Sequence, residues 1–195
     1  MLSKVLALLL IVQTAQVYSE VISVSNGAQW GQWGPWEKCP EGSVATGFSL
    51  KVMDYKYLHT IKDDTAVNGI RLHCVSCKPP HNETTITSAV APWGIWTDTQ
   101  WCDYGRLARF SERVEEDQGI KDDTAVNNFK FECTDGGKLE GQGLYWGTYG
   151  EYSETCKNGI CGLQTKVQGN EKQESAIQIS FDNTGLNDVR FICCR

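Results

Sequence analysis

The phrase IKDDTAVNGIRLHC at Ile61–Cys74 returns as IKDDTAVNNFKFEC at Ile120–Cys133. A weaker third copy, FDNTGLNDVRFIC, occupies Phe181–Cys193. In each copy the closing Cys stands eleven positions after an Asp: 63 to 74, 122 to 133 and 182 to 193. This constant spacing, kept in a diverged copy, indicates a chain built by internal triplication.

Each phrase closes a longer unit. The units open with WGQW at Trp30–Trp33, WGIW at Trp93–Trp96 and WGTY at Trp146–Tyr149. A Cys follows each opening, and then a strand-like segment that reads GFSLKV, RFSERV or GLQTKV. The pattern predicts one domain of three repeats, over about 20–78, 84–137 and 138–195.

The segments within the repeats are typical of β-structure. Phe48–Val52, Ile70–Val75 and Phe129–Cys133 mix branched or aromatic residues with alternating polar ones, and 19 glycines punctuate the chain. Each repeat has room for about four short strands, but one small sheet cannot bury its apolar face alone. Three such sheets packed around a common axis can do so. The sequence therefore predicts an all-β, three-sided prism with pseudo-threefold symmetry.

The aromatic residues that open the repeats allow two interpretations. Trp30, Trp93 and Trp146 stand at matching places, as do Trp33, Trp96 and Tyr149, and such rings could stack on sugars or fill the core between the sheets. Their equivalent placement in all repeats favours the core. Trp36 and Trp101 lack counterparts in every repeat, so we expect them to be freer for a role at the surface.

The first 19 residues have the character of a secretory signal peptide. Lys4 precedes the apolar run Val5–Val12, and Val17 and Ser19 suit the minus-three and minus-one positions of a signal-peptidase site. The run is too short to span a bilayer, and no later stretch approaches that length. We therefore expect cleavage after Ser19 and a secreted, extracellular protein without a membrane span.

Nine cysteines in a secreted chain of this size predict a disulfide framework with one cysteine left over. Because paired cysteines should hold matching places in the repeats, the predicted bridges are Cys39–Cys74, Cys102–Cys133 and Cys156–Cys193. Cys161–Cys194 then follows as an additional bridge in the third repeat. Cys194 remains an alternative to Cys193 as the partner of Cys156. Cys77 is expected to be free or to bond another molecule.

Several function classes have no support in the sequence. The formal charge of −6 supplies no basic stripe for nucleic acid. Cys74-Val-Ser-Cys77 has the spacing of half a zinc site, but His59, His73 and His81 do not stand at ligand spacing with a second cysteine pair, so no metal site is predicted. The chain has no P-loop, no His-Glu-x-x-His and no Gly-x-Ser-x-Gly motif, and no cofactor is expected.

These residues together resemble the vitelline membrane outer layer protein 1 family. The resemblance covers nearly all of the chain after the leader and is carried by WGQW, GFSLKV, DDTAVNGIRLHC, DDTAVNNFKFEC, CGLQTKVQG and LNDVRFICC. It implies a β-prism of three Greek-key sheets, secretion, four disulfides and a structural role in an extracellular coat. It also implies a likeness to some plant lectins. The chain departs from the family in its additional Cys77 and in the third phrase, where Asn183 replaces the second Asp.

The polar residues of the repeated phrase are the candidate carbohydrate-binding residues. Asp, Thr and Asn also hydrogen-bond nearby backbone in turns, so the phrase could instead fix the turn before each long strand. The Asn and the first Asp recur in all three copies, whereas the second Asp does not, which favours the turn role. The candidates are Asp63, Asp64, Asn68, Asp122, Asp123, Asn127, Asp182 and Asn187.

Two functions follow as alternatives. The first is a secreted, disulfide-stapled structural coat protein with lectin-like binding, whose partners would be extracellular glycans or glycoproteins of an egg or mucosal coat. The second is a glycosyl transferase or hydrolase acting on N-acetylated amino-sugar oligosaccharides, with carboxyls from different repeats meeting near the axis. No catalytic residue is assigned. Asn82-Glu83-Thr84 forms a sequon in the polar stretch between the first two repeats, where we expect a glycan.

Overall fold

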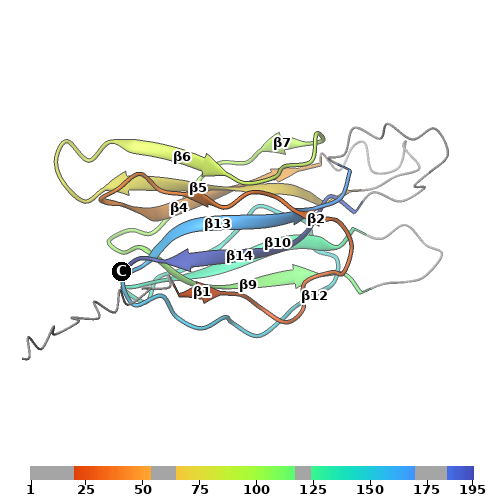
Figure 1. Ribbon diagram of the computed structural model, residues 1–195. Coiled ribbons are helices and arrows are strands. Elements are labelled where there is room, and N and C mark those ends of the chain that lie inside the picture. Colours follow the sequence, from red (N-terminus) through yellow and green to blue (C-terminus); the bar gives the residue numbers. More distant parts are fainter. Residues whose placement is uncertain (1–19, 54–64, 117–123, 170–183) are drawn as a thin grey trace, which may run out of the picture.

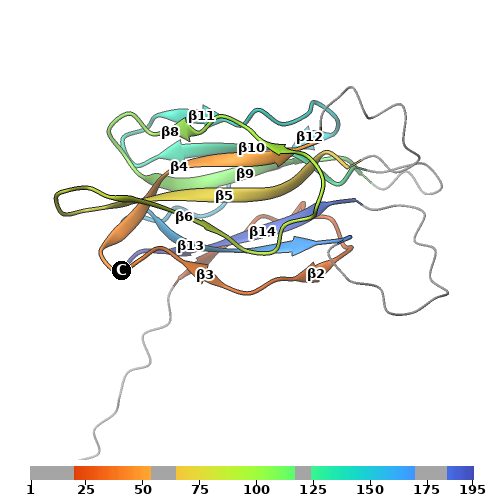
Figure 2. The ribbon, with the colours of Figure 1, turned by 90° about the horizontal axis from the view of Figure 1, so that it is seen from above.

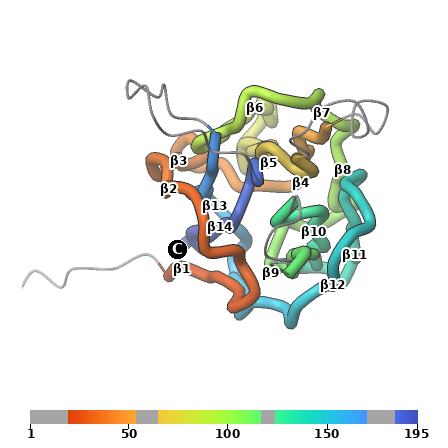
Figure 3. Tube along the Cα trace, turned by 90° about the vertical axis from the view of Figure 1, so that its right-hand side faces the viewer, coloured from red at the N-terminus to blue at the C-terminus, as the bar shows by residue number. Residues whose placement is uncertain are grey.

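The computed structural model describes residues 20–53, 65–116, 124–169 and 184–195. These residues form three antiparallel sheets, as predicted, and Figure 3 shows them arranged around a common centre. The part of the chain that is described contains no helix able to cross a membrane. The predicted leader, 1–19, and five candidate site residues lie outside the described residues: Asp63, Asp64, Asp122, Asp123 and Asp182.

Each sheet is built on one long hairpin, flanked by short strands (Figures 1 and 2). Sheet A contains β1 (Val21–Ile22), β14 (Leu186–Cys193), β13 (Ile160–Val167), β2 (Gln32–Trp33) and β3 (Glu37–Lys38). Sheet B contains β6 (Glu83–Thr87), β5 (Val67–Ser76), β4 (Ser43–Val52), β7 (Ile95–Trp96) and β8 (Gln100–Trp101). Sheet C contains β11 (Lys138–Glu140), β10 (Val126–Cys133), β9 (Leu107–Val114) and β12 (Thr148–Tyr149).

The sheets do not coincide with the sequence repeats. In sheet B the long hairpin β4–β5 comes from the first repeat, whereas β7 and β8 open the second repeat. Sheet C takes β11 and β12 from the third repeat, and sheet A takes β1, β2 and β3 from the first. One sheet per repeat, the simplest expectation from the sequence, is therefore wrong. This exchange of strands between repeats closes the prism into a ring, because β1, at the beginning of the described chain, pairs with β14, at its end, in sheet A.

The disulfides join the expected cysteines, Cys39–Cys74, Cys102–Cys133, Cys156–Cys193 and Cys161–Cys194. The first three link neighbouring sheets. The backbone N–H of Cys39, for example, donates to Cys161 O of sheet A at 2.8 Å, while Cys74 lies in β5 of sheet B. The Cys161–Cys194 bridge lies within sheet A. Cys77 is exposed and unpaired.

The core is filled by phenylalanines, not by the repeated tryptophans. Phe48 and Phe131 have ring centroids 4.5 Å apart, and Phe110 and Phe191 have theirs 4.7 Å apart, so rings of all three sheets meet at the centre. Trp33 is 36% exposed and covers the guanidinium of Arg190. Trp33 and Trp96 lie in the short strands β2 and β7 at the sheet margins and stack on arginines, so the predicted core role is wrong for these two. Trp93 packs against the core, as predicted.

Candidate functional site

The three asparagines of the repeated phrase are fully buried. Asn68 Nδ2 donates to Thr65 Oγ1 at 2.9 Å, and Asn127 Nδ2 donates to Thr124 Oγ1 at 2.7 Å. In the third copy the Thr184 hydroxyl donates to Asn187 Oδ1 at 2.9 Å. These bonds close the same short turn at the start of β5, β10 and β14, as Asn and Thr do in local turns. In the described geometry these amides do not face solvent.

Two copies of the phrase touch at Gly185. Its φ is +68°, and a Cβ at this position would lie 2.9 Å from Asn68 Oδ1 and 3.3 Å from the Cβ of Thr65. The first and second copies carry Ala66 and Ala125 at the equivalent position. The third copy needs glycine there because the turn of the first copy leaves no room for a side chain. The asparagines thus fix the turn of each copy, and a carbohydrate role for the phrase stays a prediction that rests on its aspartates.

A pocket on the outer face of sheet C brings together groups from two repeats. We call it the sheet C pocket; it has a volume of about 410 Å³. Its lining residues are Ser111, Lys130, Lys138, Leu139, Glu140, Tyr149, Gly150 and Tyr152. No local sequence pattern predicts this set of residues, since it forms only when the opening of the third repeat pairs with β9 of the second.

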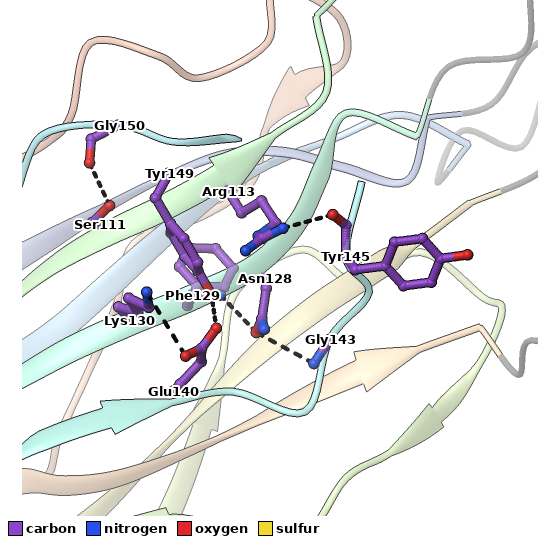
Figure 4. A network of polar contacts seen from close by, with 10 residues as sticks. All are labelled: Ser111, Arg113, Asn128, Phe129, Lys130, Glu140, Gly143, Tyr145, Tyr149 and Gly150. Carbon is purple, nitrogen blue, oxygen red and sulfur yellow. Dashed lines mark hydrogen bonds and ion pairs between the residues drawn. The ribbon is translucent and has the colours of Figure 1, made fainter. Parts of the chain in front are cut away.

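Tyr149 lines the sheet C pocket and joins the network of polar contacts drawn in Figure 4. Its hydroxyl donates to Glu140 Oε1 at 2.8 Å, and Lys130 Nζ lies 4.0 Å from the ring centroid. The Arg113 guanidinium lies 4.6 Å from the same ring. Burial, reinforced by the hydrogen bond to Glu140, raises the pKa of Tyr149 well above its ordinary value. The phenol therefore keeps its proton and acts as a donor at physiological pH.

A second tyrosine stands beside the first. Tyr152 lies under the guanidinium of Arg109, 4.8 Å from its ring centroid, and Arg109 Nη2 lies 2.7 Å from Glu132 Oε2. Burial, followed by the charge of Glu132, raises the pKa of Tyr152. The sheet C pocket thus offers two neutral phenols, one carboxylate and two ammonium groups in one concavity.

Backbone contacts hold this arrangement in place (Figure 4). The Ser111 hydroxyl donates to Gly150 O at 2.7 Å and ties the segment after β12 to β9. Arg113 Nη1 donates to Tyr145 O at 2.6 Å, and Asn128 Oδ1 accepts from Gly143 N at 3.3 Å. The segment that carries Tyr149 is therefore anchored on both sides, which is the preorganisation that ligand binding needs.

The other two sheets carry related pairs. Arg71 lies over Trp96 at 3.9 Å on sheet B, and Arg190 lies over Trp33 at 4.3 Å on sheet A. These are the positions of Lys130 and Tyr149 in sheet C. A cation stacked on an aromatic ring therefore recurs three times around the prism, and it stabilises each outer face.

Sheet B also contains a hydroxyl–imidazole–carboxylate array that no sequence motif announced. His73 Nε2 lies 3.1 Å from both Ser49 Oγ and Thr99 Oγ1, and His73 Nδ1 lies 2.6 Å from Glu83 Oε1. This is the connectivity of a nucleophile with its base and orienting acid. Ser49 is only 2% exposed, so a substrate carbonyl cannot reach its hydroxyl. The array serves to tie β4, β5, β6 and the segment before β8 together.

Carboxyls from two repeats do converge, but beneath the surface. Glu112 is fully buried, and neither of its carboxyl oxygens has a hydrogen-bond partner among the described residues. Burial, followed by the charge of Asp188, raises the pKa of Glu112 well above its ordinary value of 4.5. Asp188 comes from the third repeat, and burial raises its pKa to about 6. Because Glu112 has no contact with solvent, this pair is not placed to protonate a bound glycoside.

The prism of three antiparallel sheets, stapled at its seams and lined outside by aromatic rings, defines a protein of the β-prism class. Its fold is that of plant lectins. Calystegia sepium agglutinin matches with a TM-score of 0.53 at 11% identity, over 90% of this chain and 95% of the lectin. Single-chain recombinant jacalin matches with a TM-score of 0.53 at 12% identity, over 92% and 97%. At such identity the likeness concerns the fold alone.

The chain belongs to the vitelline membrane outer layer protein I family, whose model matches residues 20–195. The human vitelline membrane outer layer protein 1 homolog is 44% identical over 179 residues, which are 91% of this chain and 84% of that protein. The mouse homolog is 43% identical over 178 residues, with the same coverage. The resemblance found in the sequence is thereby confirmed.

Proposed function

We propose that this protein is secreted, takes part in an extracellular coat and binds glycans of that coat through the sheet C pocket. The observation that carries the proposal is the pairing of Tyr149 and Tyr152 with Glu140 and the two lysines in one preorganised concavity. Membership of an outer-layer family and the lectin fold support the same function.

The chemistry of the pocket suits a saccharide. A phenol ring offers an apolar face for one side of a pyranose, while hydroxyl, carboxylate and ammonium groups bond its hydroxyls. The four disulfides and the anchored segment keep the pocket rigid, so little conformational entropy is lost on binding.

The test is a glycan array followed by calorimetry with the best ligand found. Tyr149→Ala and Tyr152→Ala should each weaken binding about tenfold or more, which corresponds to about 1.4 kcal/mol. Tyr104→Ala is the matched control, because Tyr104 is 96% exposed and lies outside the pocket. Glycan binding that is equally strong in all three variants would rule the pocket out.

The repeated phrase is the second candidate for the glycan site, and the aspartates Asp63, Asp64, Asp122, Asp123 and Asp182 would carry it. The buried asparagines Asn68, Asn127 and Asn187 would then position these aspartates. Turnover of N-acetylated amino-sugar oligosaccharides is the enzymatic alternative. Both are tested in the same samples, by binding to Asp123→Asn and by chromatography of the oligosaccharides after incubation.

A further inference from the structure

The charge of the sheet C pocket is opposite to that of the chain. The chain carries a formal charge of −6. Among the lining residues of the pocket, Lys130 and Lys138 face a single carboxylate, that of Glu140. A local excess of positive charge on an acidic protein concentrates anionic ligands near that site.

The nearby carboxylates already have short partners. Glu140 accepts the Tyr149 hydroxyl at 2.8 Å, and Glu132 is paired with Arg109 at 2.7 Å. Each carboxylate is therefore engaged by a group other than the two lysines. The ammonium groups of Lys130 and Lys138 form no hydrogen bonds with these two carboxylates.

The two lysines correspondingly form no hydrogen bond with a carboxylate of the described residues. Lys130 Nζ lies 3.8 Å from Glu140 Oε2, which is too long for a hydrogen bond. Lys138 forms no ion pair with any carboxylate of the described residues, although it stands opposite Glu132 in the β10–β11 register. Both side chains line the same concavity as the two tyrosines, so both can reach a ligand held there.

The equivalent cations on the other sheets have different surroundings. Arg190 lies between two rings, 4.3 Å from Trp33 and 5.0 Å from Trp36, and its Nε donates to Gln164 Oε1 at 2.7 Å. The outer face of sheet A thus uses its cation internally. On sheet C, Lys130 stacks on Tyr149 and forms a long ion pair with Glu140, while Lys138 has no ion pair among the described residues. Both ammonium groups can therefore still bind an anion.

We propose that the sheet C pocket selects acidic saccharides, with Lys130 and Lys138 binding a carboxylate or sulfate ester while the tyrosines contact the sugar ring. This proposal rests on the proposed function and adds a substrate class to it. Charge-assisted hydrogen bonds are about twice as strong as neutral ones, so an anionic group gains most beside two ammonium groups that form no hydrogen bond with a carboxylate of the described residues. The hydroxyls of a neutral sugar would compensate the lost hydration of the same lysines only in part, because a neutral oxygen is a weaker acceptor for an ammonium group than an anionic one.

The experiment uses three hexasaccharides prepared from one chondroitin sulfate: the sulfated form, a desulfated form that keeps its uronates, and a carboxyl-reduced desulfated form that is neutral. Binding of the full-length secreted protein is measured by calorimetry at low and at physiological salt. We expect the sulfated or the uronate form to bind about tenfold tighter than the neutral form. We expect this preference to shrink as salt rises. The order of the two charged forms distinguishes sulfate from carboxylate recognition.

Lys130→Gln combined with Lys138→Gln should abolish the preference for the charged forms, so that all three saccharides bind with about equal affinity. Lys157→Gln, at an exposed lysine outside the pocket, is the control and should keep the preference. Equal affinity for all three saccharides, with binding still lost in Tyr149→Ala, would overturn the acidic preference while the proposed glycan site stands. A preference that survives the double substitution would also overturn it. Absence of binding to these saccharides and to the array would refute the proposed function itself.

Discussion

Cys39 and Cys74 belong to the same sequence repeat, yet their disulfide joins sheet A to sheet B. The equivalent bridges Cys102–Cys133 and Cys156–Cys193 join B to C and C to A. A bridge within a repeat is a bridge between sheets because the opening strands of each repeat pair with the hairpin of the preceding one. Three covalent links therefore close the prism at its three seams.

Removal of one seam bridge should cost substantial stability. Cys102 and Cys133 are 31 residues apart, and a loop of this size contributes roughly 3–4 kcal/mol by restricting the unfolded chain. Cys102→Ala with Cys133→Ala should lower the free energy of unfolding by about this amount, as measured in urea. Cys77→Ala is the control and should leave the free energy unchanged, because Cys77 is exposed and unpaired. Equal stability of the two variants would show that the seam bridge does not restrain the chain.

Substitutions in the repeated phrase should mainly change the stability of the fold. Asn127 is fully buried and donates from Nδ2 to Thr124 Oγ1 and to Ala125 O. Asn127→Ala should cost about 1–3 kcal/mol, since it leaves these acceptors without their donor. Asp123→Asn should cost little, because the third copy already carries Asn183 there. A stable Asp123→Asn protein that has lost a demonstrated glycan activity would make the phrase a binding site.

Stability should fall as pH rises through the titration of the buried carboxyls. The folded-state pKa of Asp188 is about 6 against an ordinary value of 3.8, and that of Glu112 is raised well above 4.5. The folded protein therefore binds more protons than the unfolded chain above pH 4, so the free energy of unfolding decreases from about pH 4 upward. The decrease due to Asp188 ends near pH 6, while that due to Glu112 extends further.

Glu112→Leu tests this dependence, because the first repeat carries Leu50 at the equivalent position. The variant should be more stable than the natural protein at pH 8 and should show a flatter profile in urea unfolding between pH 4 and 8. Glu116→Gln, at an exposed site, controls for a simple change in net charge and should keep the natural slope. The charged groups that act on Asp188 are Lys166 and Arg190, and both oppose the rise in its pKa. An unchanged slope in Glu112→Leu would contradict the assignment.

Asn82 should carry an N-linked glycan when the protein is secreted from eukaryotic cells. Asn82 and Thr84 are both exposed at the start of β6, so the sequon is accessible. Treatment with glycosidase F should reduce the mass of the secreted protein, and Asn82→Gln should have the reduced mass without treatment. Secreted natural protein whose mass does not change on treatment would show that the sequon is unused.

The local pattern of the sequence was sufficient for the class of fold. The spacing from Asp to Cys in each copy marked the triplication, and matching places in the repeats identified the cysteine pairs, including Cys39 with Cys74. Alternating residues in segments such as Phe129–Cys133 marked the strands. These features are readable because strand period and repeat spacing depend on residues close together in the chain.

Contacts between distant residues were decided only by the tertiary structure. Tyr149 meets Lys130 and Glu140 because β12 of the third repeat adds to the hairpin of the second, and no local pattern announces that exchange. The same exchange turns Trp33 outward over Arg190 and places Glu112 in the seam beside Asp188. The sequence by itself determined the repeats, the strands and the disulfide partners of Cys39 and Cys102, whereas the choice of Cys193 over Cys194 as the partner of Cys156 came from the structure. The choice of neighbouring sheet, and with it the pocket and the buried acids, arose from packing, since each repeat can bury its apolar face only against the other two.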